Sequence, residues 1–212
     1  IFSIHPDLNN LYKKISKLEN ISKKNFIITS GIDGAIHQVF ENFTKPKDNI
    51  IKLNPTWQMY DVYSKVFKTN SLNLNFDNSL KLNIKSLSNL LKKKPKIIFL
   101  SYPNSPIEGN LDENLIKKII SLVPRKCIIV IDEVYFGFGS KSFIKFALNK
   151  KNIIVTRSFS KTFGLPSIRL GYLISNKKII KKITETRLAY ETNTFSAVIA
   201  EYFLNNLNII KK

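Results

Sequence analysis

Cysteine is almost absent from this chain, since Cys127 is the only one among 212 residues. One thiol cannot build an intrachain disulfide framework, which excludes the small secreted proteins that depend on one. Cys127 opens an apolar run, residues 127–131, so we expect it in the core. No apolar run approaches the roughly 20 residues that cross a bilayer, and no secretory signal is visible at the start. We therefore expect a cytoplasmic protein without a membrane partner.

Acidic residues are also scarce, with 15 against 34 basic ones, which gives a formal net charge of +19. Such a charge raises the possibility of nucleic acid or an anionic membrane as partner. Arginine, however, occurs only at positions 125, 157, 169 and 187, and arginine is favoured where phosphates or base edges are read. Lysines such as 92–94 and 177–182 fall where helices would show their outer faces. Drift toward A/T-rich codons, which Lys, Asn and Ile share, explains this composition better than a nucleic-acid site.

Hydrophobic residues make up 43% of the chain, enough for a sizeable core. Helical spacing and short β-like runs alternate along it. The predicted helices are residues 7–19, 36–43, 58–67, 84–91, 111–122, 177–190 and 195–207. The predicted strands are residues 26–29, 49–53, 71–75, 96–100, 127–131, 152–156 and 170–175. This order predicts an α/β fold with a mainly parallel sheet, in which the uninterrupted run 127–131 takes a central position. Asp112 is a candidate N-cap.

One segment, residues 156–171, places a lysine among hydroxyls and guanidinium groups. Lys161 is flanked by Ser158 and Ser160, with Arg157 and Arg169 nearby. Hydroxyls and a guanidinium around an amine indicate an anion held next to a nucleophilic nitrogen, as a phosphate-bearing aldehyde bound as a Schiff base would need. A solvated lysine in a loop is the alternative, and this segment alone favours it.

Three other segments put polar groups after predicted strands. Gly31 and Asp33 lie in a strand–glycine turn–helix arrangement that leaves backbone N–H groups for an anion, although many such turns look the same. Residues 103–106 form a proline-bounded loop where open α/β sheets bind ligands. Asp132, Glu133 and Tyr135 follow the central strand, and two acids with a tyrosine there favour a ligand contact. Trp57, the only tryptophan, is either core packing or a plate that stacks on a planar ligand.

Five blocks in order resemble those of the fold-type I pyridoxal-phosphate (PLP) enzymes, in the class I/II aminotransferase group. The blocks are residues 29–36, 55–60, 103–108, 132–135 and 158–171. The last, Ser-x-Ser-Lys with a trailing Arg-x-Gly, is the most specific. The chain is most similar to the histidinol-phosphate aminotransferase and threonine-phosphate decarboxylase branch. The resemblance implies a three-layer αβα fold with a mainly parallel mixed sheet.

The resemblance also implies roles for single residues. Lys161 would bind pyridoxal 5'-phosphate as a Schiff base and act as general base. Asp132 would pair with the pyridinium nitrogen, and Tyr135 would hydrogen-bond the phenolic oxygen. Trp57 would stack on the ring. The phosphate would be held by Ser158, Ser160, Arg169 and the N–H groups of Gly31, Ile32 and Asp33. Asn104 or Ser105 would reach the phenolic oxygen from the other side; the sequence leaves the choice open. No metal ligand set is predicted.

The chain departs from the family pattern at Ile107, Glu108 and Gly34, and His5 stands where the family has a tyrosine. We expect residues 1–212 to be the PLP-binding large domain, with the amino-terminal arm and the C-terminal small domain largely missing. The arginine that binds the substrate carboxylate is expected beyond residue 212. The family implies a homodimer.

The function predicted from the resemblance is a PLP-dependent aminotransferase that moves an amino group between an amino acid and a keto or phosphorylated acceptor. Two alternatives remain: a PLP-dependent decarboxylase of a phosphorylated amino acid, and a basic nucleic-acid-binding protein. The same Lys161, Asp132 and Tyr135 would serve transamination and decarboxylation, so the sequence does not separate these two reactions.

Overall fold

The computed structural model describes residues 5–187, 189 and 192–210. Within these residues one sheet has the strand order β1-β7-β6-β5-β4-β2-β3. The strands are β1 Phe26–Thr29, β2 Asn49–Asn54, β3 Asn70–Asn75, β4 Ile97–Ser101, β5 Ile128–Asp132, β6 Ile153–Ser158 and β7 Gly171–Ile174. Strands β3, β2, β4, β5 and β6 run parallel, whereas β7 is antiparallel to both β6 and β1. The sheet is therefore mixed and mainly parallel, as predicted, and β5 is central.

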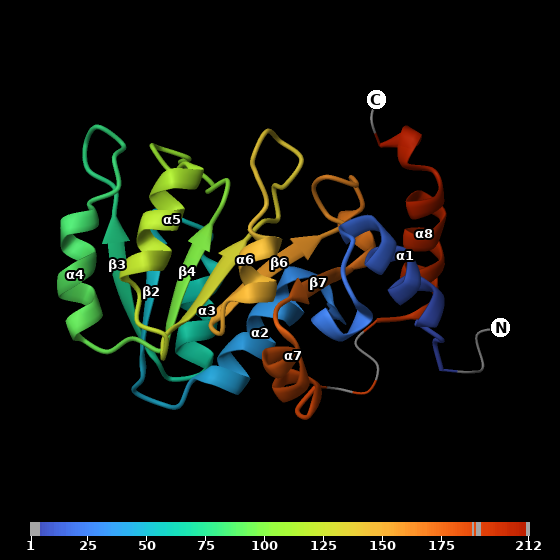
Figure 1. Cartoon of the computed structure of the whole chain (residues 1–212), viewed down its shortest axis with the longest axis horizontal. Coiled ribbons are helices and arrows are strands. Elements are labelled where there is room, and N and C mark those ends of the chain that lie inside the picture. Colours follow the sequence, from blue (N-terminus) through green and yellow to red (C-terminus); the bar gives the residue numbers. More distant parts are fainter. Residues whose placement is uncertain (1–4, 188, 190–191, 211–212) are drawn as a thin grey trace.

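Helices cover both faces of this sheet (Figure 1). They are α1 Asn9–Glu19, α2 Gly31–Phe43, α3 Met59–Val66, α4 Ile84–Lys92, α5 Glu113–Leu122, α6 Ile144–Asn149, α7 Lys177–Thr184 and α8 Thr194–Asn205. Side chains of α2, α3 and α7 form one hydrophobic layer with the sheet. Side chains of α1, α4, α5, α6 and α8 form the other layer. The predicted three-layer αβα architecture is confirmed.

The two layers are separated by the alternation of side chains along the strands. On β4, Ile98 and Leu100 belong to one hydrophobic cluster, while Ile97 and Phe99 belong to the other. Because successive side chains of a strand point to opposite faces, a strand buried on both faces must be apolar at every position. This requirement is why the central strands could be identified as continuous apolar runs. It also directs their polar residues to the strand ends, where the site forms.

Most predicted boundaries lie within two residues of the observed ones, and Asp112 caps α5 by accepting a hydrogen bond from the Leu115 backbone N–H at 2.7 Å. The helix after the glycine turn begins at Gly31, earlier than the predicted 36, because its first turn includes the glycine turn itself. Helix α7 ends at Thr184, where the prediction continued to 190; positions 188 and 190 of that prediction lie outside the described residues. The six-residue α6 was not predicted because it spans less than two turns.

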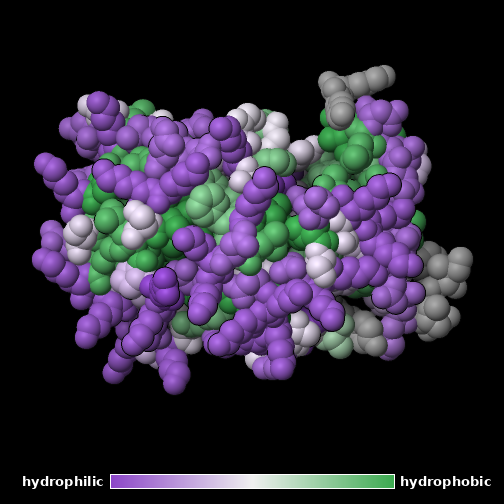
Figure 2. All heavy atoms as spheres, viewed as in Figure 1, coloured by the Kyte–Doolittle hydropathy of each residue, from purple (hydrophilic) through white to green (hydrophobic). Residues whose placement is uncertain are grey.

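Much of the positive charge lies on lysines at the surface. Polar side chains cover much of the face shown in Figure 2. Lysines 92–94, 177, 178, 181 and 182 are all exposed, as expected for the outer faces of α4 and α7. No helix among the described residues is long and apolar enough to cross a membrane.

Candidate active site

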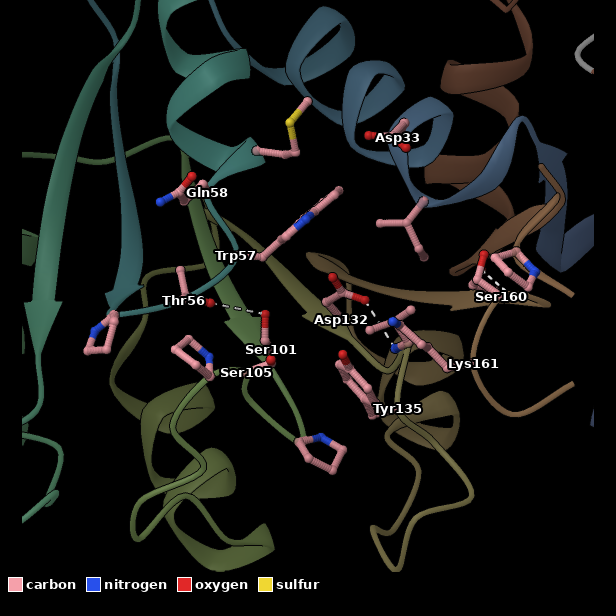
Figure 3. Close-up of a pocket in the computed structure, with 18 of the residues that line it drawn as sticks. Asp33, Thr56, Trp57, Gln58, Ser101, Ser105, Asp132, Tyr135, Ser160 and Lys161 are labelled. Carbon is pink, nitrogen blue, oxygen red and sulfur yellow. Dashed lines mark hydrogen bonds between the residues drawn. The ribbon is translucent and has the colours of Figure 1, made fainter. Parts of the chain in front are cut away.

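A cavity of about 750 Å³ lies where the parallel strands end. Its wall comes from residues at or just after the carboxyl ends of β2, β4, β5 and β6, together with the start of α2 and the loop before β7. Ten of the predicted site residues line it: Ile32, Asp33, Trp57, Ser105, Asp132, Tyr135, Ser158, Ser160, Lys161 and Arg169. Since strand ends of a parallel sheet meet at one edge, segments far apart in the sequence converge here. Figure 3 shows the labelled members of this wall.

Asp132, the last residue of β5, is only 2% exposed and is held by three hydrogen bonds. Its Oδ1 accepts from Thr156 Oγ1 at 3.0 Å and from the Val134 backbone N–H at 3.1 Å. Its Oδ2 accepts from the Tyr60 hydroxyl at 2.7 Å. Burial raises the pKa of Asp132, while these three donors lower it. Among the residues that the structure describes, no cationic side chain forms an ion pair with Asp132.

Lys161 follows β6 and reaches the same cavity. Its Nζ lies 5.4 Å from the centroid of the Tyr135 ring, an amine–aromatic contact. Tyr135 is half-buried, and Lys161 is exposed. In Figure 3 Tyr135 lies below Asp132 and Lys161 lies to its right, so an amine, a phenol and a carboxylate border one space.

The far corner of the cavity holds an arginine and the start of a helix. Arg169 Nη2 lies 2.8 Å from Asp33 Oδ2, and α2 begins beside it at Gly31. The first N–H groups of a helix have no partner within the helix and attract anions. Gly31 has φ +68°, a backbone conformation that favours glycine, and a Cβ there would lie 3.1 Å from Arg169 Nη2, so the guanidinium would have to shift slightly. Gly171 meets the Gly31 backbone similarly, because its Cβ would be 2.8 Å from the Gly31 carbonyl carbon.

Ser158 and Ser160 complete this corner. The Ser160 backbone N–H donates to Ser158 Oγ at 3.0 Å, which folds the loop after β6 back on itself. Both serines line the cavity. Gly31 itself is not among the lining residues; it contributes through the helix start and through its contact with Arg169.

Trp57 forms another side of the cavity, above Asp132 in Figure 3. Its ring meets that of Tyr60 edge to face, with centroids 5.5 Å apart and an interplanar angle of 86°. The indole is half-buried. One flat side chain thus borders the cavity close to the buried carboxylate, which agrees with the stacking alternative considered for Trp57.

The structure distinguishes Asn104 from Ser105, the two candidates in the loop after β4 between which the sequence could not choose. Asn104 is 6% exposed and accepts from Thr56 Oγ1 at 2.6 Å. Its amide donates to the carbonyl oxygens of Pro55 and Ile107. These bonds hold the loop, and Asn104 does not line the cavity, whereas Ser105 does.

Glu133 does not share the cavity with Asp132. It is 1% exposed, and its Oε2 lies 2.8 Å from Arg157 Nη2. Its Oε1 accepts from the Phe143 backbone N–H at 2.5 Å. Arg157 is also buried and stacks over the Phe136 ring, 3.4 Å from its centroid. Of the two neighbouring acids for which the sequence favoured a ligand contact, only Asp132 lines the cavity.

Sequence reasoning missed the polar residues that surround Asp132. Tyr60 on α3, Ser101 at the end of β4 and Thr156 on β6 are buried and hydrogen-bonded there. Ser101 and Thr156 carried a usable signal, since each is a polar residue near the carboxyl end of an apolar strand, as Asp132 is. Tyr60 carried none, because its helical spacing from Trp57 is also that of a core residue.

Solved structures confirm the fold. A histidinol-phosphate aminotransferase from Sinorhizobium meliloti, in complex with pyridoxal-5'-phosphate, superimposes with a TM-score of 0.90 at 18% identity, over 99% of this chain and 59% of that one. An L-threonine-O-3-phosphate decarboxylase from Porphyromonas gingivalis gives 0.81 at 18% identity, over 97% of this chain and 64% of that one. Both similarities show the fold of the large domain that the resemblance implied.

Two relatives at higher identity are histidinol-phosphate aminotransferases. A histidinol-phosphate aminotransferase of Clostridium novyi is 33% identical over 208 residues, 98% of this chain and 58% of that protein. One of Caldanaerobacter subterraneus is 30% identical over 201 residues, 93% of this chain and 57% of that protein. The chain thus spans less than two thirds of the length of these relatives. The family model for aminotransferase class I and II matches residues 2–210, and the chain belongs to this family.

Proposed function

We propose that this cavity binds pyridoxal 5'-phosphate. The observation that carries the proposal is Asp132, a buried carboxylate with three donors but no cation among the described residues. A carboxylate has about four acceptor positions, so one remains. A buried negative charge is costly unless a positive group neutralises it, and a protonated ring nitrogen at the cavity wall would supply that group.

The rest of the cavity fits the other parts of the cofactor. Arg169 and the start of α2 suit the phosphate, with Ser158 and Ser160 as further donors. Trp57 suits the face of the ring. Tyr135 and Ser105 suit the phenolic oxygen, and Ser105 replaces the undecided pair because it alone lines the cavity.

Lys161 is the nucleophile and proton carrier in this proposal. Its amine would hold the cofactor at the aldehyde carbon, with loss of water, and its Nζ would act as the general base for the substrate's α-proton. The bound cofactor supplies an electron sink for the carbanion. Asp132 stabilises that sink by holding a positive charge at the ring nitrogen. Arg169 and the α2 N-terminus hold the phosphate in place.

The first experiment adds PLP to the purified protein and follows visible absorbance, then treats the sample with borohydride and locates the adduct by peptide mass spectrometry. We expect one adduct, on Lys161, because this lysine alone among those that the structure describes lines the cavity. Lys161→Ala should abolish it. The control Lys178→Ala, an exposed lysine on α7, should leave it unchanged. An equal borohydride-stable adduct in Lys161→Ala would remove Lys161 from its role.

We further propose that the complete gene product transfers an amino group between an amino acid and a keto or phosphorylated acceptor. The two histidinol-phosphate aminotransferases support this reaction, and histidinol phosphate is the first substrate to test. A screen of amino donors and keto acceptors that also measures released CO₂ separates transamination from decarboxylation. CO₂ release from a phosphorylated amino acid without amino transfer would favour the alternative that the Porphyromonas gingivalis neighbour represents.

We propose a homodimer as the working form, in the cytoplasm. Large apolar side chains remain exposed on the described surface, among them Val198 and Tyr202 on α8 and Phe138, whose ring centroid lies 6.0 Å from that of Tyr135. Burying them against a second copy would remove apolar area from water. Sedimentation analysis of the complete gene product tests this proposal, and a monomer at micromolar concentration with bound cofactor would reject it. Fractionation of the source cells tests the compartment.

A further inference from the structure

Tyr60 is a buried side chain on α3 whose hydroxyl points at Asp132. It is 0% exposed, and its hydroxyl donates to Asp132 Oδ2 at 2.7 Å. The other two donors, Thr156 and Val134, both bond Oδ1. Counting two acceptor positions per oxygen leaves one position, on Oδ2. Tyr60 and a ligand in the cavity would therefore share the same carboxylate oxygen.

The Tyr60 ring has little freedom to leave this arrangement. It stacks on Phe99, with centroids 4.6 Å apart and planes at 17°, and meets Trp57 edge to face at 5.5 Å. Phe99 belongs to strand β4 and Trp57 to the cavity wall before α3. The phenol is therefore held in place relative to both the sheet and the cavity. A rigid donor is worth more than a flexible one because less conformational freedom is lost when the bond forms.

The Tyr60 hydroxyl is itself polarised by a second hydroxyl. Ser101 Oγ lies 3.0 Å from it. Because the single Tyr60 proton goes to Asp132, Ser101 must be the donor to Tyr60. A hydroxyl that accepts one hydrogen bond becomes a stronger donor in the next. Ser101 Oγ also lies 3.3 Å from Thr56 Oγ1, which donates to Asn104 in the loop after β4. A chain of polar groups thus runs from that loop to Asp132.

We propose that Tyr60 is a positioning residue that keeps Asp132 ionised and presents the remaining Oδ2 acceptor to the ring nitrogen of the cofactor. This inference rests on the proposed binding of pyridoxal phosphate. Without the Tyr60 hydroxyl, the buried carboxylate loses a donor that the fold holds in place. It then holds its charge less well and is free to turn about its side-chain torsion, so its pairing with a protonated nitrogen weakens.

The test compares two ligands on the same protein. One is pyridoxal 5'-phosphate; the other is its carbocyclic analogue, in which C–H replaces the ring nitrogen. Tyr60→Phe keeps the ring packing and removes only the hydroxyl. We expect this change to raise the Kd of pyridoxal phosphate about 10-fold, the effect of one hydrogen bond to a charged group, and to leave the Kd of the analogue nearly unchanged.

The matched control is Tyr172→Phe. Tyr172 is 2% exposed and its hydroxyl donates to Glu19 Oε1 at 2.5 Å, so it too is a buried phenol bound to a carboxylate, but it does not line the cavity. Its replacement should lower the thermal midpoint without changing either Kd. If Tyr60→Phe does not fold, Ser101→Ala removes the donor to Tyr60 and should give a smaller change of the same kind.

The outcomes distinguish a failure of the Tyr60 role from a failure of the proposed function. If the unaltered protein binds pyridoxal phosphate and neither Tyr60→Phe nor Ser101→Ala changes its Kd, Tyr60 has no positioning role although the proposed function stands. An equal loss of both ligands would make Tyr60 a structural residue only. If the unaltered protein binds neither ligand, the proposed function itself fails.

Discussion

At the residue scale, two adjacent acids have opposite fates. Asp132 faces the cavity and takes only neutral donors, whereas Glu133 is paired with Arg157 on the other side. Successive side chains of an extended segment point in opposite directions, so only one of them can face the site. The sequence predicted the position of this acidic pair. It could not predict the partner of each acid, because Arg157 and Tyr60 approach from other elements.

The charge of Asp132 gives a pH-dependent prediction for the protein without cofactor. Burial raises its pKa, so the folded state binds a proton more tightly than the unfolded chain does. The contribution of Asp132 to the unfolding free energy therefore falls as the pH rises above the ordinary aspartate pKa of about 3.9. Asp132→Asn lacks this titration. The substitution also changes stability by an amount that does not depend on pH. Beyond that constant, the unfolding free energy of the variant minus that of the parent should increase from about pH 4 toward neutrality. Guanidinium unfolding at several pH values measures the difference, and a flat or declining difference would contradict the expectation.

At the element scale, the parallel strands were predictable and the antiparallel edge was not. A strand buried on both faces can be recognised in the sequence as a run of apolar residues, as β4 and β5 can. Strands β1 and β7, four residues each, give the same local signal, but nothing in either segment specifies its partner. Their pairing, with Thr29 opposite Gly171, depends on contacts between distant parts of the chain. For the same reason the sequence identified the site's strand-end residues better than Tyr60.

The buried cluster around Arg157 connects several elements and predicts a large stability effect. Arg157 on β6 contacts Glu133 after β5 and, at 3.4 Å, Glu19 at the end of α1. Arg157→Met would leave Glu133 buried without a cation, and we expect a loss of about 3–5 kcal/mol in unfolding free energy. Adding Glu133→Gln should restore part of the loss.

Denaturant unfolding of the three proteins measures the cluster directly. Lys117→Met is the control, because Lys117 pairs with Glu113 on the exposed side of α5, where an ion pair contributes little. A double variant that is less stable than Arg157→Met would show that Glu133 does not need its arginine.

At the scale of the whole molecule, the charge of +19 is dispersed over exposed lysines on separate helices. A dispersed charge attracts polyanions through released counterions and without sequence preference. We expect weak binding to duplex DNA at 50 mM salt, independent of sequence, with a Kd that rises by two orders of magnitude or more by about 200 mM salt. Fluorescence anisotropy with two unrelated duplexes measures this. Tight binding to one duplex only, at the higher salt, would revive the nucleic-acid alternative.

The position of β1 at the edge of the sheet has a consequence for folding during synthesis. Within the described residues β1 has β7 as its one neighbour, and the ribosome makes β1, residues 26–29, well before β7, residues 171–174. The nascent chain must therefore carry β1, whose four residues are all buried in the final fold, without its partner until β7 has been made. An unpaired apolar strand invites wrong pairing. The corner where Gly31 meets Arg169 and Gly171 cannot assemble until β7 has left the ribosome.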